Sequence, residues 1–108
     1  MVLLAAAAAA QSAKDQIAQG RALFEHHCGR CHRPGGDGPE LTRDALAPKG
    51  TALGLFDFVR ANMPHDAPGT LKEQEYWDIV AHVLAAAGVV RAGPPVGPDT
   101  AAGIRLPE

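Results

Sequence analysis

The sequence predicts an all-α protein, because helical periodicity recurs along the chain while strand signals are scarce. Three segments carry the helical pattern: residues 12–27, 51–62 and 70–88. Apolar residues recur in them at intervals of three and four, which gathers them on one face of a helix. Loops dense in glycine and proline separate the segments, and no β-sheet is needed to account for the chain.

The length and the charge predict one small domain without a broad basic surface. The 108 residues suffice for a single domain, and a net charge of −2 argues against nucleic acid as a partner. The aromatic residues are few: Phe24, Phe56, Phe58, Tyr76 and Trp77. A cofactor would add apolar surface to the limited core of so short a chain.

Residues 1–11 differ in composition from the rest and are interpreted as a signal-peptide remnant or leader. Residues 2–10 are apolar, and small residues around Gln11 suit cleavage by a signal peptidase. The alternative is an unstructured alanine-rich leader. Because a bilayer span needs about 20 apolar residues, we expect an exported, soluble protein without a membrane span, its single domain covering residues 12–108.

The first predicted helix begins at a capping signal. Ser12 is followed three residues later by Asp15, as in a capping box. Ile17, Gly20 and Phe24 then fall on one side of the helix. A glycine in a helix interior costs about 1 kcal/mol relative to alanine. Gly20 is therefore either a tolerated weakness or a place where another helix packs closely.

A short helical turn is predicted over residues 41–46, and the sequence "APKG" that follows ends it. In the helix predicted over 51–62, Leu53, Phe56 and Val59 lie near helical spacing. Residues 33–40 and 63–69, rich in glycine and proline, are predicted to be loops.

The last predicted helix has the clearest pattern. Thr70 and Glu73 form a capping box, and Gly88 is placed to end the helix. Its apolar stripe consists of Tyr76, Ile79, Val80, Val83 and Ala87. Residues 89–108 are interpreted either as a disordered tail or as an extended strip that lies over the domain.

The cysteines Cys28 and Cys31 stand in the sequence "CGRCH", and four kinds of site use such a pair. A structural zinc site needs four ligands, usually in two pairs, and a second pair is missing. A thioredoxin-like redox pair follows a strand, whereas this one ends a predicted helix. A disulfide would close a very short loop and stabilise little. In C-x-x-C-H haem attachment, the thiols add to the porphyrin vinyl groups and His32 ligates the iron.

A second axial ligand would lie on the opposite face of such a haem. Apart from Met1 the chain has one methionine, Met63, in a proline-containing loop. A thioether suits an electron-transfer haem and raises its reduction potential. Pro64 keeps the segment extended. His65, two residues on, and an open or water-bound site are the alternatives to Met63.

The remaining histidines are weaker candidates for a ligand. His26 and His27 precede the motif on the same helix and would have to bend back. His82 lies on the last helix, where a solvated face is the ordinary expectation.

With these motifs the chain resembles the class I c-type cytochromes, which are small monohaem electron carriers. Gly20 and Phe24 stand where that family's first helix carries a glycine and an aromatic residue. "CGRCH" matches the haem-binding motif, "GPEL" (38–41) the Gly-Pro-x-Leu loop, and "NMP" (62–64) the methionine loop. Residues 67–88 and the tail look like those of bacterial members that serve periplasmic dehydrogenases.

The resemblance implies a small cytochrome c fold, with three to five helices around one haem c bound covalently through Cys28 and Cys31. The first and last helices are expected to cross near Gly20, with Ile79 and Val83 packing there. The likeness of the tail favours an ordered strip over residues 89–108.

The resemblance also assigns roles around the haem. His32 and Met63 would be the two metal ligands. The carbonyl of Pro39 would accept a hydrogen bond from the other ring nitrogen of His32, and Leu41 would pack on the haem. One departure is His82, which stands where the family often has tyrosine. A partly buried His82 could then be held by Asp78, four residues earlier.

These features together predict a periplasmic one-electron carrier and not an enzyme. Its expected partners are a periplasmic dehydrogenase as donor and an oxidase or another cytochrome as acceptor. The alternatives are a cytochrome subunit bound tightly in a dehydrogenase complex, and a haem sensor with an open sixth site.

Overall fold

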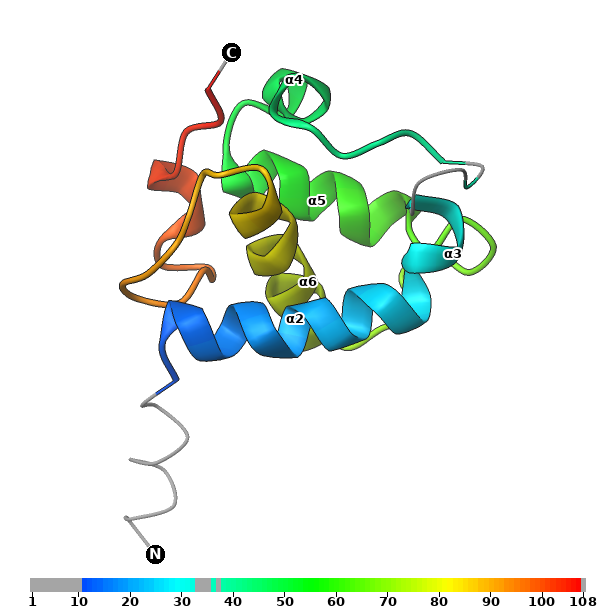
Figure 1. The fold of residues 1–108 in the computed structure, drawn as a ribbon, viewed down its shortest axis with the longest axis horizontal. Helices are drawn as coiled ribbons and strands as arrows, with labels where there is room; N and C mark the ends of the chain where they lie inside the picture. The colour runs from blue at the N-terminus through cyan, green and yellow to red at the C-terminus, as the bar shows by residue number, and fades with distance from the viewer. Residues whose placement is uncertain (1–10, 33–35, 37, 108) are drawn as a thin grey trace, which may run out of the picture.

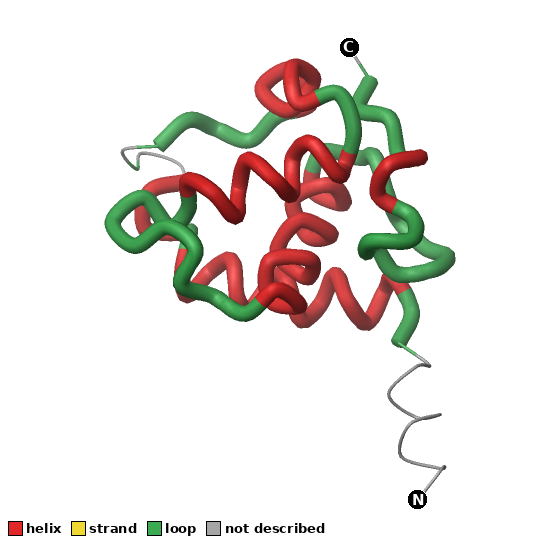
Figure 2. The backbone as a smooth tube through the Cα atoms, turned by 180° about the vertical axis from the view of Figure 1, so that it is seen from behind, coloured by secondary structure: helices red, strands yellow, loops and turns green. Residues whose placement is uncertain are grey.

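The computed structural model describes residues 11–32, 36 and 38–107, and that part of the chain contains helices and loops but no strand (Figures 1 and 2). One isolated β-bridge pairs Thr51 with Arg105. The all-α prediction is confirmed. The elements are α2 (Ala13–His27), α3 (Gly29–His32), α4 (Arg43–Leu46), a 3-10 turn η1 (Ala47–Lys49), α5 (Ala52–Asn62), α6 (Glu73–Ala86) and a 3-10 turn η2 (Ala101–Gly103).

Hydroxyl side chains cap the starts of three helices. Ser12, Thr42 and Thr51 each accept a hydrogen bond from the backbone N–H three residues later, at 3.1–3.2 Å. Each bond satisfies one of the N–H groups that a helix leaves unpaired in its first turn. The sequence-based start of the first helix at Ser12 is confirmed.

The predicted start of the last helix is wrong by two residues, because the N-cap is Lys72 and not Thr70. α6 begins at Glu73, and its capping contact joins the Lys72 N–H to the Glu75 carboxylate at 2.9 Å. The Thr70 hydroxyl instead donates to the Ala67 carbonyl at 2.7 Å. Thr70 therefore stabilises the preceding turn, because its hydroxyl is already engaged there.

α2 crosses α6, as Figure 1 shows, and the two helices meet at Gly20. A Cβ atom at Gly20 would stand 1.7 Å from the backbone oxygen of Asp78 and 3.1 Å from Cβ of His82. No side chain fits in that space, so the glycine permits the close approach of the two helices. The interpretation of Gly20 as a packing position is confirmed.

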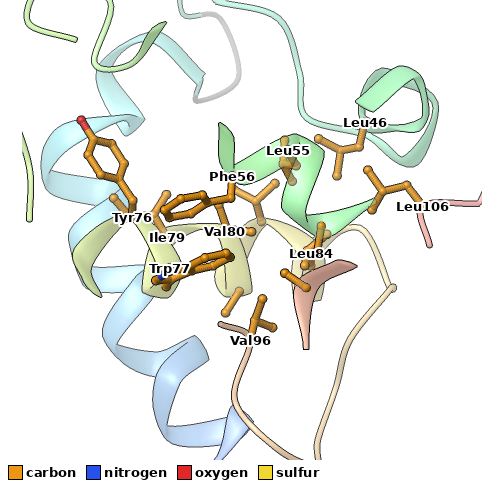
Figure 3. Close-up of a cluster of buried hydrophobic side chains, with 14 of the residues drawn as sticks. Leu46, Leu55, Phe56, Tyr76, Trp77, Ile79, Val80, Leu84, Val96 and Leu106 are labelled. Atoms are coloured by element: carbon orange, nitrogen blue, oxygen red, sulfur yellow. The ribbon is translucent and has the colours of Figure 1, made fainter. Parts of the chain in front are cut away.

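The apolar core lies between α5, α6 and the C-terminal segment (Figure 3). The rings of Phe56 and Trp77 stack at its centre, with centroids 3.6 Å apart and planes 10° from parallel. On α5 the buried residues are Ala52, Leu55 and Phe56. Leu53 and Val59, which the pattern placed on the same face as Phe56, are only partly buried.

The chain reverses direction after α6 and returns across the domain. Gly88 adopts a positive φ of 79°, and the Val89 N–H donates to the Leu84 carbonyl at 2.8 Å, which ends the helix as predicted. Further on, Val96 and Leu106 are buried.

One buried side chain fastens this returning segment to α2. Gln16 is fully buried, and its amide donates to the Val96 carbonyl and accepts from the Val96 N–H, both at 2.7 Å. A side-chain amide thus replaces the backbone partner that a neighbouring strand would supply.

Two sequence-based interpretations fall wholly or partly on residues that the structure does not describe. They are the leader over 1–11, of which only Gln11 is described, and the loop over 33–40, of which residues 33–35 and 37 are not.

Candidate functional site

A cavity of about 580 Å³ opens beside the cysteine motif and lies within the size range of small-molecule and cofactor sites. α2 and α3 border it on one side, and α5 with the loop after it borders it on another. The six residues singled out from the sequence all line it: Cys28, Cys31, His32, Pro39, Leu41 and Met63. Ile79 and Val83 of α6 also line it.

Both cysteines are free thiols of intermediate exposure. Burial raises the pKa of the Cys28 thiol to about 11, and the charge of the neighbouring Cys31 adds to the rise. A redox-active cysteine of the thioredoxin type has a lowered pKa instead. The environment of Cys28 therefore argues against a thiol–disulfide exchange site.

The described residues also argue against a metal site made by the protein alone. Within residues 11–32, 36 and 38–107, no group of three or more histidine, cysteine, aspartate or glutamate side chains is placed to hold a metal ion. A zinc site of four protein ligands therefore has no support in that part of the chain.

His32 is oriented by a hydrogen bond from its ring. Its Nδ1 lies 2.8 Å from the carbonyl oxygen of Pro39. A carbonyl can only accept, so Nδ1 carries the proton and Nε2 keeps a lone pair that can bind a metal. A Cβ at Gly38 would lie 3.0 Å from Cε1 of His32, so a glycine lets this loop approach the ring.

Met63 terminates α5 in an extended conformation, with φ −124° and ψ 151°. Its N–H donates to the Val59 carbonyl at 2.8 Å, and its own carbonyl accepts from the hydroxyl of Tyr76 at 2.8 Å. Sequence reasoning placed Tyr76 only in the apolar stripe of the last helix. Nothing in the sequence indicated that its hydroxyl reaches the methionine loop, 13 positions earlier.

Other cavity residues include titratable and aromatic side chains. His27, His65 and Asp66 line the cavity. Lys49 also lines it, and its Nζ stands 3.5 Å above the ring centroid of Phe58, a cation–π contact at the rim. Phe58 is 39% exposed, and among the described residues it is the large hydrophobic side chain that is exposed to solvent.

His82 is half-buried at the helix crossing and does not lie on a free polar face. Its ring centroid is 5.1 Å from that of Phe24. Burial lowers the pKa of His82, and the charge of Arg21 lowers it further, while Glu25 acts in the opposite direction. The expected pair with Asp78 is not formed, because the Asp78 carboxylate accepts a hydrogen bond from the Gln74 amide at 2.8 Å instead.

The residues present fit a covalently attached haem. Two thiols, an imidazole with a free Nε2 and a thioether line one cavity, whose other walls include Leu41, Leu55, Val59, Ile79 and Val83. Thiol, imidazole and thioether groups are the attachment and axial-ligand types of c-type haem. None of the described helices is long and apolar enough to cross a membrane.

Comparison with known proteins gives one match. The family model described as "Cytochrome C oxidase, cbb3-type, subunit III" matches residues 15–83, which is more than half of the chain. The matched region contains the cysteine motif, the loop with Met63 and most of α6. No curated protein and no solved structure matches the chain.

Proposed function

The chain belongs to the family described as cytochrome C oxidase, cbb3-type, subunit III, a family of c-type cytochrome domains, and from this premise we propose that it is a one-electron carrier with a single His/Met-ligated haem c. The family makes it a haem-binding electron-transfer protein of the class I type, with a small cytochrome c fold, and not an enzyme.

The observation that carries the proposal is the convergence of four donor groups on one cavity. Cys28, Cys31 and His32 come from the end of α2 and from α3, and Met63 comes from the end of α5. In the C-x-x-C-H motif the two cysteines attach the haem and the histidine ligates the iron, and a methionine from a separate loop is a usual second ligand.

In this proposal Cys28 and Cys31 form two thioether bonds that hold the haem against α3. His32 binds the iron through Nε2, because Nδ1 is occupied by the Pro39 carbonyl. That contact orients the imidazole and makes it a stronger electron donor. Leu41 packs against the haem. The haem, when bound, supplies a one-electron iron couple.

The environment suits electron transfer better than chemistry on a substrate. His32 and Met63 would stay bound in both oxidation states, so little rearrangement opposes the gain or loss of an electron. Such a saturated site leaves no coordination position for a substrate. A partner needs only brief contact near the haem edge, for which a small interface is typical.

The ligand assignment is tested by spectra of the holoprotein and two variants. We expect a reduced-minus-oxidised difference spectrum of a c-type haem, and in the oxidised protein a sulfur–iron charge-transfer band. Met63→Ala should lose that band, whereas His65→Ala, a matched change in the same loop, should keep it. An unchanged band in Met63→Ala would sink the assignment, and carbon monoxide binding to the reduced wild type would favour a sensor with an open sixth site.

We further propose that the protein works in the periplasm, where it accepts electrons from a dehydrogenase and passes them to an oxidase or another cytochrome. The apolar start of the sequence and the likeness of residues 67–88 to bacterial members support this placement. Fractionation of the source cells tests it, and recovery of the haem protein from the cytoplasm would contradict it.

A second arrangement is a cytochrome held permanently in a larger complex. The description of the matched family names an oxidase subunit, which favours this alternative. Size-exclusion chromatography of the native protein distinguishes the two. A free shuttle elutes as a particle of about the chain's own 11.2 kDa, and a subunit elutes with its partners.

A further inference from the structure

One buried hydroxyl lies at the start of the methionine loop. Tyr76 is 1% exposed, and its ring belongs to the apolar core. In Figure 3 the ring lies at the edge of the cluster, and its oxygen points away from the other labelled side chains. The hydroxyl donates to the Met63 carbonyl at 2.8 Å. Tyr76 itself does not line the cavity.

The same hydroxyl also reaches the far end of the loop. The Leu71 N–H donates to the Tyr76 oxygen at 3.4 Å, and the Gly69 N–H donates to the Met63 carbonyl at 3.4 Å. The loop from Met63 to Leu71 is thus closed on itself through one side chain of α6.

Met63 has both backbone polar groups engaged. Its N–H is held by the Val59 carbonyl of α5, and its carbonyl is held chiefly by Tyr76 of α6. The first contact belongs to the helix end, but the second comes from a different helix. The position of Met63 between α5 and the cavity therefore depends on a tertiary hydrogen bond.

We propose that Tyr76 is a positioning residue for Met63. Its hydroxyl holds the methionine backbone where the sulfur can reach a haem iron, and so it sets the strength of the sulfur–iron bond. The inference rests on the proposed ligation by Met63. It predicts that loss of the hydroxyl weakens the sulfur ligand without removing any group from the cavity.

The test compares Tyr76→Phe with Thr100→Val, both as haem-loaded protein. Tyr76→Phe keeps the buried ring and deletes only the hydroxyl. Thr100→Val likewise deletes one hydroxyl, which donates to the Pro95 carbonyl at 3.0 Å, in a segment that does not line the cavity. The measurements are the sulfur–iron band, the affinity of the oxidised protein for cyanide, and the reduction potential.

Cyanide competes with the sulfur for the iron, so its affinity reports the strength of the native bond. In Tyr76→Phe we expect a weaker band, a lower potential and cyanide affinity higher by roughly two- to tenfold, the effect of one net hydrogen bond. Thr100→Val should match the wild type in all three. Equal values for Tyr76→Phe and the wild type would overturn the proposal.

A wild-type protein without the sulfur–iron band would instead overturn ligation by Met63, and the role of Tyr76 with it. If Tyr76→Phe does not bind haem, NMR of the wild-type holoprotein tests the proposal in its place. A slowly exchanging Tyr76 hydroxyl proton supports the contact with Met63, and a hydroxyl that exchanges freely with solvent refutes it.

Discussion

Replacing Gly20 with alanine tests whether the crossing of α2 and α6 is as close as the structure has it. The added Cβ would lie 1.7 Å from the backbone oxygen of Asp78, half of the 3.4 Å at which ordinary contact begins. The obstructing atom belongs to the backbone of a buried helix, so no side-chain rotation can relieve the clash. The two helices would have to move apart along their contact.

Two opposing terms set the size of the effect. Overpacking typically costs about 1–3 kcal/mol, and a clash with backbone belongs at the upper end of that range. Alanine is favoured over glycine in a helix interior by about 1 kcal/mol. The net expectation is a loss of about 2 kcal/mol, which for a domain of this size lowers Tm by about 8–16 °C.

Thermal unfolding of the holoprotein, followed by circular dichroism, measures this difference. Gly103→Ala is the matched control, because no atom lies within 4 Å of a Cβ built there. The control should unfold within a few degrees of the wild type. If Gly20→Ala were as stable as the wild type, or more stable, helix propensity would outweigh packing and the close crossing would be refuted.

Three further predictions concern the tail, the helix crossing and the imidazole. Gln16→Ala should lower the free energy of unfolding by about 3 kcal/mol, because two buried backbone groups of Val96 lose their partner; urea unfolding measures it, and an unchanged midpoint would count against the buried clamp. Burial raises the pKa of Asp78 above its ordinary 3.8, so folding favours the protonated acid. This contribution to stability is complete below 3.8 and is lost as the pH rises from 3.8 through the higher pKa of the folded protein. Asp78→Asn should therefore be more stable than the wild type at neutral pH and similar to it below 3.8, and a less stable variant at neutral pH would contradict this reasoning. Gly38→Ala should push the loop from the ring of His32, weaken the Nδ1 hydrogen bond and raise the reduction potential, which potentiometric titration checks against the unsubstituted protein.

The helices and the members of the site could be predicted because their signals are local. A capping residue such as Ser12 acts within one turn, and the spacing of Cys28, Cys31 and His32 is itself the C-x-x-C-H pattern. Met63 was singled out as the candidate sulfur ligand because the sequence has no other methionine apart from Met1. The structure places it in the same cavity as the motif.

The sequence-based predictions were wrong where a side chain had two possible hydrogen-bonding partners nearby in the sequence. Thr70 satisfies the rule for an N-cap, yet its hydroxyl bonds the turn before it, and the helix begins at Glu73. Asp78 and His82 satisfy the rule for an i, i+4 pair, yet Asp78 bonds Gln74. Spacing alone does not rank such partners, because burial and the neighbouring element decide between them.

The sequence by itself indicated the chemistry proposed for this protein: a C-x-x-C-H motif of the haem-attachment type, one candidate sulfur ligand, and helices to carry them. Only the tertiary structure decided how those parts are held. Gln16 joins Val96 across 80 positions of sequence, and Tyr76 joins Met63 from another helix. Such contacts leave no periodic trace in a sequence, because they depend on where helices meet and on which buried polar groups still lack a partner.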